Sequence, residues 1–157
     1  MKAPILGCVL GSAACAAALA QTPNETAVRA AFGHYDHGWR VFDVDEVLSV
    51  MAPDCQWVNS VGVRMAGKPA FRRFLTRIFG DANFRAGAPG RLSIHAISFP
   101  APSVAVVDSS ESTSHQIDST TGKAVPVLHT NELTIMQNRG GQWLIVNDLT
   151  SDESHGI

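Results

Sequence analysis

Five polar side chains interrupt apolar patterns in this sequence, and these residues are its strongest candidates for chemistry. Asn59, His129, Asn131 and Asn147 each occupy the apolar face of a segment in which polar and apolar residues alternate, and Tyr35 adds a hydroxyl to an apolar helix stripe. An unpaired buried polar group costs about 1–3 kcal/mol, so each of them needs a partner. We interpret them as the polar floor of one pocket. The alternatives are that they bond one another, face solvent or lie in a dimer interface.

The chemistry that these residue types support is acid–base catalysis on a small apolar carbonyl compound. His129 is the predicted acid or base, because the unperturbed pKa of histidine is about 6.5. Tyr35 and Asn59 are the predicted hydrogen-bond donors to a developing oxyanion. The residues that we expect to contact the ligand are Trp39, Trp57, Asn131 and Asn147.

Other reactive side chains give weaker signals. His34 and His37 have the spacing that places two imidazoles on one helix face, but no third ligand accompanies them, so no metal site is predicted. The sequence has no phosphate-binding glycine loop, CxxC pair or other cofactor motif, and we expect no cofactor. Cys55 is the one cysteine outside the first twenty residues, and we expect it to be a buried small hydrophobe.

The composition favours one globular domain. The chain has 157 residues, of which 45% are hydrophobic and 17% charged, and its net charge is −2. This balance provides no basic surface for nucleic acid, so no nucleic-acid partner is expected.

Residues 1–20 have the features of a secretory signal peptide. Lys2 precedes an Ala-rich apolar run, and Ala18-Leu19-Ala20 is a typical cleavage site. A lipoprotein anchored at Cys8 is the less favoured alternative. We therefore expect a periplasmic or secreted protein that has no membrane contact after cleavage, with residues 21–157 as its single domain.

The periodicity of the mature chain predicts an α+β fold. Thr22-Pro23-Asn24-Glu25 is a capping box, and Val28, Phe32, Tyr35, Trp39 and Phe42 follow on one helix stripe. A short second helix ends before Pro53, a strand covers 55–63, and a third helix runs from Lys68 to Gly80. Residues 80–90 are predicted to be a mobile loop, and four strands follow from residue 91. Three helices against a strongly bent, mainly antiparallel sheet make a cone-shaped half-barrel with a pocket at its mouth.

These segments resemble the superfamily of ketosteroid isomerase, scytalone dehydratase, SnoaL-like cyclases and nuclear transport factor 2-like domains, most closely its secreted SgcJ/EcaC-type group. The resemblance rests on the order and spacing of short segments over the whole mature chain: the helix with Tyr35 and Trp39, then 42–48, 52–59, 67–71 and 141–146. It implies a cystatin-like cone and pairing of two copies through the sheet.

The position-by-position comparison disfavours ketosteroid isomerase activity. Tyr35 matches the oxyanion-hole tyrosine of that enzyme, but Asn59 stands where its general base is an aspartate, and an amide cannot abstract a proton. The second, protonated aspartate of the enzyme falls near His129. Three functions remain open: an isomerase, lyase or cyclase, a periplasmic binding module that uses the same pocket, and a homodimeric interaction domain.

Overall fold

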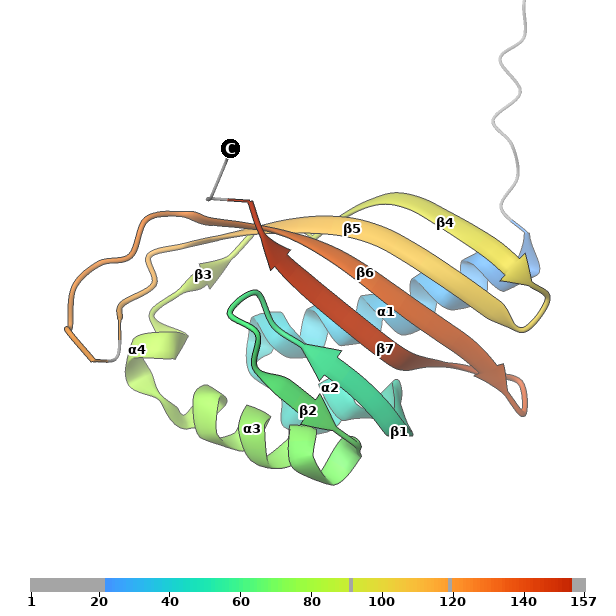
Figure 1. Ribbon diagram of the computed structural model, residues 1–157, viewed down its shortest axis with the longest axis horizontal. Helices are drawn as coiled ribbons and strands as arrows, with labels where there is room; N and C mark the ends of the chain where they lie inside the picture. The colour runs from blue at the N-terminus through green and yellow to red at the C-terminus, as the bar shows by residue number, and fades with distance from the viewer. Residues whose placement is uncertain (1–21, 91, 119, 154–157) are drawn as a thin grey trace, which may run out of the picture.

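A computed structural model describes residues 22–90, 92–118 and 120–153 (Figure 1). The predicted signal peptide, residues 1–20, lies outside the described residues. The elements in chain order are α1 (Pro23–Val41), α2 (Val44–Ser49), β1 (Met51–Val58), β2 (Arg64–Ala66), α3 (Lys68–Gly80), α4 (Ala82–Arg85), β3 (Ala88–Pro89), β4 (Ser93–Ala101), β5 (Val104–Ser114), β6 (Leu128–Arg139) and β7 (Gln142–Asp152). Among the described residues, no helix is both long and apolar enough to span a bilayer.

The predicted caps of the first two helices are present. The hydroxyl of Thr22 accepts the backbone N–H of Glu25 at 3.2 Å and so caps α1. Asp43 caps α2 by accepting the backbone N–H groups of Asp45 and Glu46 at 2.9 and 3.0 Å. The first helix ends at Val41, so Phe42 is its left-handed cap residue rather than the last member of the predicted stripe.

The strands form one open, mixed sheet in the order β2-β1-β7-β6-β5-β3, and β4 also pairs with β5. β1 and β7 run parallel, whereas the other pairs are antiparallel. Figure 1 shows α1 lying across one face of the sheet and α3 close to β1 and β2. The predicted α+β architecture, with helices packed against a bent sheet, is confirmed.

The core lies between this sheet face and the helices. Its largest fully buried side chains include Phe32, Phe71, Met51, Leu75 and Met136. Each such side chain contributes about 1.5–3 kcal/mol by leaving water. Inward residues of β5 and β6 are apolar toward one end of each strand and polar toward the other, so the core fills only part of the cone.

Two predicted element boundaries are wrong. The chain is already extended at Met51, and Pro53 lies inside β1, where the pairing with β7 shifts register between Met51 and Gln56. A proline is tolerated there because the irregular ladder does not need its missing N–H. The segment after Gly80 contains α4, capped by the side chain of Asp81, and β3, so it is ordered structure rather than a loop throughout.

Candidate functional site

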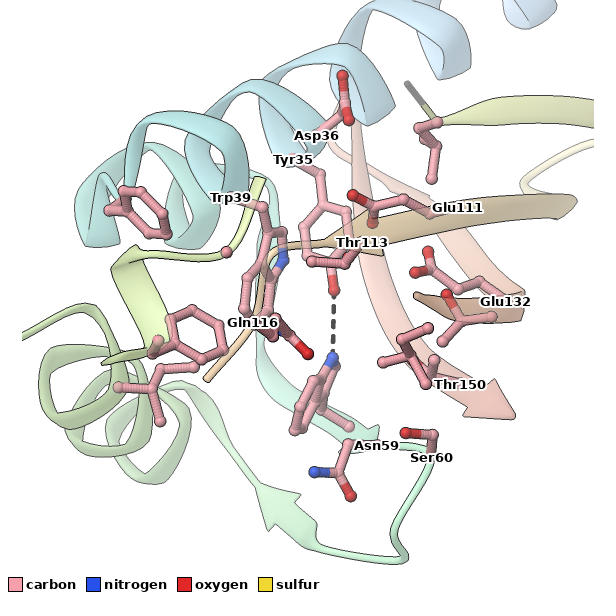
Figure 2. Close-up of a pocket in the computed structure, with 18 of the residues that line it drawn as sticks. Tyr35, Asp36, Trp39, Asn59, Ser60, Glu111, Thr113, Gln116, Glu132 and Thr150 are labelled. Atoms are coloured by element: carbon pink, nitrogen blue, oxygen red, sulfur yellow. Dashed lines mark hydrogen bonds between the residues drawn. The ribbon is translucent and has the colours of Figure 1, made fainter. Parts of the chain in front are cut away.

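A cavity of about 190 Å³ lies between the helices and the polar ends of the strands (Figure 2). This space exceeds an apolar cavity of about 150 Å³ that suffices for benzene in another protein. The cavity therefore has room for a molecule of one or two small rings.

One side of the cavity is aromatic. Trp39 of α1 stacks on Trp57 of β1 with ring centroids 6.0 Å apart, and Trp57 contacts Phe74 of α3 at 5.1 Å. Phe42 meets Phe84 of α4 edge-on at 6.1 Å. All five rings line the cavity, and they supply a rigid apolar wall.

The opposite side is polar and is formed by the sheet. Glu111 of β5 pairs in register with Thr130 of β6, and Glu132 lies two residues further along β6 on the same face. Side chains at such diagonal positions are within reach of each other. Figure 2 shows Glu111 and Glu132 extending from the sheet into the cavity, with Thr150 of β7 beside them.

A buried hydrogen-bond network lies behind this wall. The Tyr35 hydroxyl donates to Oδ2 of Asp148 at 2.6 Å, and Trp57 Nε1 donates to the Tyr35 oxygen at 3.1 Å. Thr134 donates to Oδ1 of Asp148, also at 2.6 Å. Both oxygens of the fully buried Asp148 carboxylate are thus satisfied, which is the condition for keeping a charge inside a protein.

Glu132 and Asp148 compete for one proton. Burial raises the pKa of both carboxyl groups, but the hydrogen bonds from Thr134 and Tyr35 oppose the rise at Asp148. The pKa of Glu132 is raised further by the nearby charges of Asp148 and Glu111, and its Oε2 atom is buried without a partner. The negative charge therefore belongs on Asp148 and the proton on Glu132, which makes Glu132 a neutral donor.

Glu111 titrates near neutrality. Burial, followed by the charge of Asp36, raises its pKa to about 7, and Arg40 opposes this shift. Asp36 lines the same cavity from α1 and pairs with Arg40 at 3.6 Å. Glu111 can therefore accept and return a proton at physiological pH, as a general base must.

Two buried polar atoms lack partners among the described residues. They are Ser109 Oγ and Glu132 Oε2, and these residues are directly paired across β5 and β6. Buried polar atoms in native proteins nearly always have a protein or water partner. The sheet therefore leaves hydrogen-bonding capacity unused at the position where Glu132 enters the cavity.

Four of the predicted site residues line the cavity: Tyr35, Trp39, Trp57 and Asn59. Asn59 does so from the turn after β1 rather than from the strand, because β1 ends at Val58. Its side-chain oxygen accepts the backbone N–H groups of Val61 and Val63 at 3.2 and 2.8 Å. The amide therefore closes this turn, and only its nitrogen is free to serve as a donor.

The predicted inward orientation of His129, Asn131 and Asn147 is wrong. His129 and Asn131 are exposed on the outer face of β6, and Asn131 donates to Glu153 at the end of the sheet. Asn147 lies outside the cavity lining, because the β6–β7 register shifts beside it and turns Asp148 inward instead. His129 thus lies outside the cavity lining, on the opposite face of the strand from Leu128 and Thr130.

Four further residues of this site, Glu111, Glu132, Thr134 and Asp148, were not predicted from the sequence. A signal was available, because every strand has two faces. The second face of β6 consists of its even-numbered residues, Leu128, Thr130, Glu132, Thr134 and Met136. The rule that apolar residues point inward assigned this face to the outside, because three of these residues are polar. The rule fails here because the inner face lines a polar cavity at one end of the strand and the core at the other.

The weaker candidates lie outside the cavity lining. His34 and His37 bind the same Glu46 carboxylate through Nδ1 at 3.2 and 2.6 Å, and the described residues contain no group able to hold a metal ion. Cys55 is buried, as predicted, and burial raises the pKa of its thiol.

Comparison with known proteins identifies the fold. No protein-family profile and no curated protein sequence matches the chain. A cystatin-like protein from Caulobacter vibrioides has a TM-score of 0.74 and 18% identity over 83% of this chain and 89% of its own. A ketosteroid isomerase-like protein from Erwinia carotovora atroseptica has a TM-score of 0.70 and 16% identity, covering 85% of this chain and 99% of its own. For an NTF2-like protein of unknown function from Pseudomonas putida, the TM-score is 0.66 and the identity 15%, with coverages of 83% and 87%. The chain therefore has the cystatin-like cone that nuclear transport factor 2-like and ketosteroid isomerase-like proteins share.

Proposed function

We propose that this protein binds a small apolar carbonyl compound in the cavity and moves a proton on it, as an isomerase or a lyase does. The observation that carries the proposal is the position of Glu111, whose pKa of about 7 is matched to proton transfer, at an apolar cavity beside Glu132. The likeness to a structure described as ketosteroid isomerase-like supports a reaction of this class.

The two glutamates have different roles in the proposed reaction. Neutral Glu132 donates a hydrogen bond to the carbonyl oxygen, and ionised Glu111 removes a proton from the carbon next to the carbonyl. The electron pair of the broken C–H bond forms the enolate, whose oxygen Glu132 stabilises. Glu111 then returns the same proton to the γ-carbon of a β,γ-unsaturated ketone, so the double bond moves into conjugation and no other reactant is consumed.

A steroid is not proposed as the substrate. The general base of ketosteroid isomerase corresponds to Asn59, an amide whose oxygen closes a turn. Glu111 reaches the cavity from β5 instead, so the proposed base removes a proton from a different side of the cavity than a base at position 59 would.

Export to the periplasm is part of the proposal. It rests on the cleavable-signal pattern in residues 1–20. Expression of the full chain in a Gram-negative host, followed by osmotic shock and intact-mass measurement, tests it. A mass that begins at residue 21 supports export, and retention of the full-length chain in the cytoplasm contradicts it.

Isomerisation of 3-cyclohexen-1-one tests the catalytic proposal. The conjugated product absorbs in the ultraviolet, so its formation is followed directly. Glu111→Gln should lower the rate by about 10²–10⁴-fold, the usual contribution of a general base. His129→Ala is the matched control and should retain the rate, because this side chain is on the outer face. Full activity in Glu111→Gln refutes the proposal, and binding of the ketone without turnover identifies a binding module instead.

We further propose that two copies pair through the outer face of the sheet. Leu133 of β6 and Leu149 of β7 are directly paired there and are 46% and 48% exposed. Ile135 and Val58 extend the same surface. Sheet faces turned to water normally present polar residues, so an apolar outer face favours a protein partner.

A further inference from the structure

The charge of the cavity lining is entirely acidic. Asp36, Glu111 and Glu132 line it together with Tyr35, and no Lys, Arg or His within the described residues does so. Asp148 adds a fourth carboxyl immediately behind Tyr35. An anionic ligand would enter this cavity against repulsion from every ionised group on its wall, whereas a cation would be attracted.

The aromatic wall favours the same charge. Trp39, Trp57 and Phe74 line the same cavity as the carboxyl groups, and Figure 2 shows Trp39 on the side away from Glu132. The faces of aromatic rings carry partial negative charge, and indole is the strongest of the three common rings in binding cations. An acidic wall together with an aromatic lining therefore suits a positively charged group on an apolar body.

An independent observation shows unused hydrogen-bonding capacity at this place. Glu132 Oε2 is buried and unpartnered, and Ser109 Oγ, unpartnered as well, lies on the directly paired residue. A neutral carboxyl group has one O–H donor and one acceptor oxygen. When the O–H of Glu132 binds the carbonyl oxygen of the ligand, its second oxygen can accept an N–H from the same molecule.

We propose that the ligand is an amino ketone: a protonated amine lies between Glu111, Asp36 and the acceptor oxygen of Glu132, and the carbonyl oxygen accepts the Glu132 proton. The carbonyl half of this inference rests on the proposed function, whereas the amine half rests on the acidic and aromatic walls. An ammonium group has enough N–H donors for more than one of these carboxyl groups.

The bound amine also sets the protonation state of the base. Glu111 faces Asp36 and Arg40 from α1 and Glu132 from β6, and with these neighbours its pKa is about 7. A cation placed beside it lowers that pKa, so Glu111 loses its proton when the ligand binds. Binding near pH 7 therefore releases protons, and affinity rises with pH as long as the amine stays protonated.

Nortropinone and bicyclo[3.2.1]octan-3-one provide a matched pair of probes, since they share the bicyclic skeleton and the ketone and differ only in the bridge, which is a secondary amine in the first and a CH2 group in the second. Calorimetry at pH 7 should show nortropinone binding about tenfold or more tightly than the carbon analogue. Titrations in buffers of different ionisation enthalpy should show proton release with nortropinone alone. The anion 4-oxocyclohexanecarboxylate should not bind.

Two variants complete the test. Glu111→Gln should abolish both the preference for nortropinone and the proton release, whereas Asp108→Asn, which changes an exposed carboxylate on the outer side of the same strand, should retain both. Equal affinity for the two ketones, binding by neither, or a preference that survives Glu111→Gln overturns the inference.

Deuterium exchange at the carbons next to the carbonyl separates this inference from the proposed function. Equal binding of the two ketones with catalysed exchange refutes the amine and leaves the proton-transfer chemistry intact. Selective binding of nortropinone without exchange in either ketone supports the amine and refutes the proton-transfer chemistry.

Discussion

Tyr35 donates its hydroxyl proton to Asp148 at 2.6 Å, and this bond determines what Tyr35 contributes to the cavity. A phenol has one proton, so Tyr35 cannot also donate to a ligand oxyanion while Asp148 is ionised. Its oxygen already accepts from Trp57. Tyr35 is therefore a positioning residue that fixes Trp57 in the aromatic wall and holds the buried charge of Asp148, and the neutral donor of the site is Glu132.

Removal of this bond should destabilise the protein. Tyr35→Phe leaves one oxygen of a buried carboxylate without a donor, and we expect a loss of about 1.5–3 kcal/mol in the free energy of unfolding. Asp148→Asn should cost a similar amount. Chemical denaturation of both variants and of the double variant gives the coupling energy, which should be about 1 kcal/mol or more. Asp108→Asn is the exposed control and should change little. Additive effects of the two substitutions would show that the bond contributes nothing to stability.

Glu111 should make the protein less stable as the pH rises. The pKa of this carboxyl is about 7 in the folded state and about 4.5 in the unfolded chain, so the folded state binds more protons between these values. The free energy of unfolding therefore falls as the pH rises from 4.5 to 7, by at most about 3 kcal/mol. Thermal unfolding across this range should show a smaller decline in Glu111→Gln than in the wild-type protein. The same decline in both proteins would contradict the raised pKa.

Two glycines of α1 should respond oppositely to alanine. A Cβ at Gly38 would lie 2.7 Å from the backbone nitrogen of Val47 and 2.8 Å from its Cγ2, so α2 must move away from α1. Gly38→Ala should therefore cost about 1–3 kcal/mol, the usual penalty for overpacking. Gly33 has nothing within 4 Å of the corresponding position, and Gly33→Ala should stabilise the helix by up to about 1 kcal/mol. Denaturation midpoints compare the two variants. Stabilisation by Gly38→Ala would contradict the close packing of α2 against α1 at this glycine.

The fold was predictable from the sequence because its signals are local. The hydroxyl of Thr22, the carboxylate of Asp43 and the apolar stripe from Val28 to Trp39 specify helix starts and faces within a few residues. These signals do not depend on distant parts of the chain. The order of elements, and with it the α+β cone, follows from them.

Only part of the site was predictable, because the residues of a strand that point inward depend on how that strand pairs with its neighbours. One extra residue at Val146 shifts the register between β6 and β7, so Asp148 points inward where the alternation assigned Asn147. Between β5 and β6 the pairing is regular, yet Leu133 and Ile135 are on the outer face of β6 and Glu132 is on the inner one. The mistake in β7 comes from this extra residue. The mistake in β6 comes from assigning the apolar side of a strand to the interior, which holds for a packed core and fails at a polar cavity beside an apolar surface.

That apolar surface provides the last prediction. Leu133 and Leu149 are adjacent on the outer face, and a second copy related by a two-fold axis would place each pair against its own equivalent. Light scattering coupled to size-exclusion chromatography should show a dimer for the wild-type protein. Leu133→Arg should yield monomers, because it brings two like charges into the desolvated centre of a symmetric contact. Val61→Arg is the matched control, since Val61 is 77% exposed in the turn between β1 and β2, and this variant should remain dimeric. A wild-type monomer at all concentrations, or a Leu133→Arg dimer, would show that the outer face does not pair two copies.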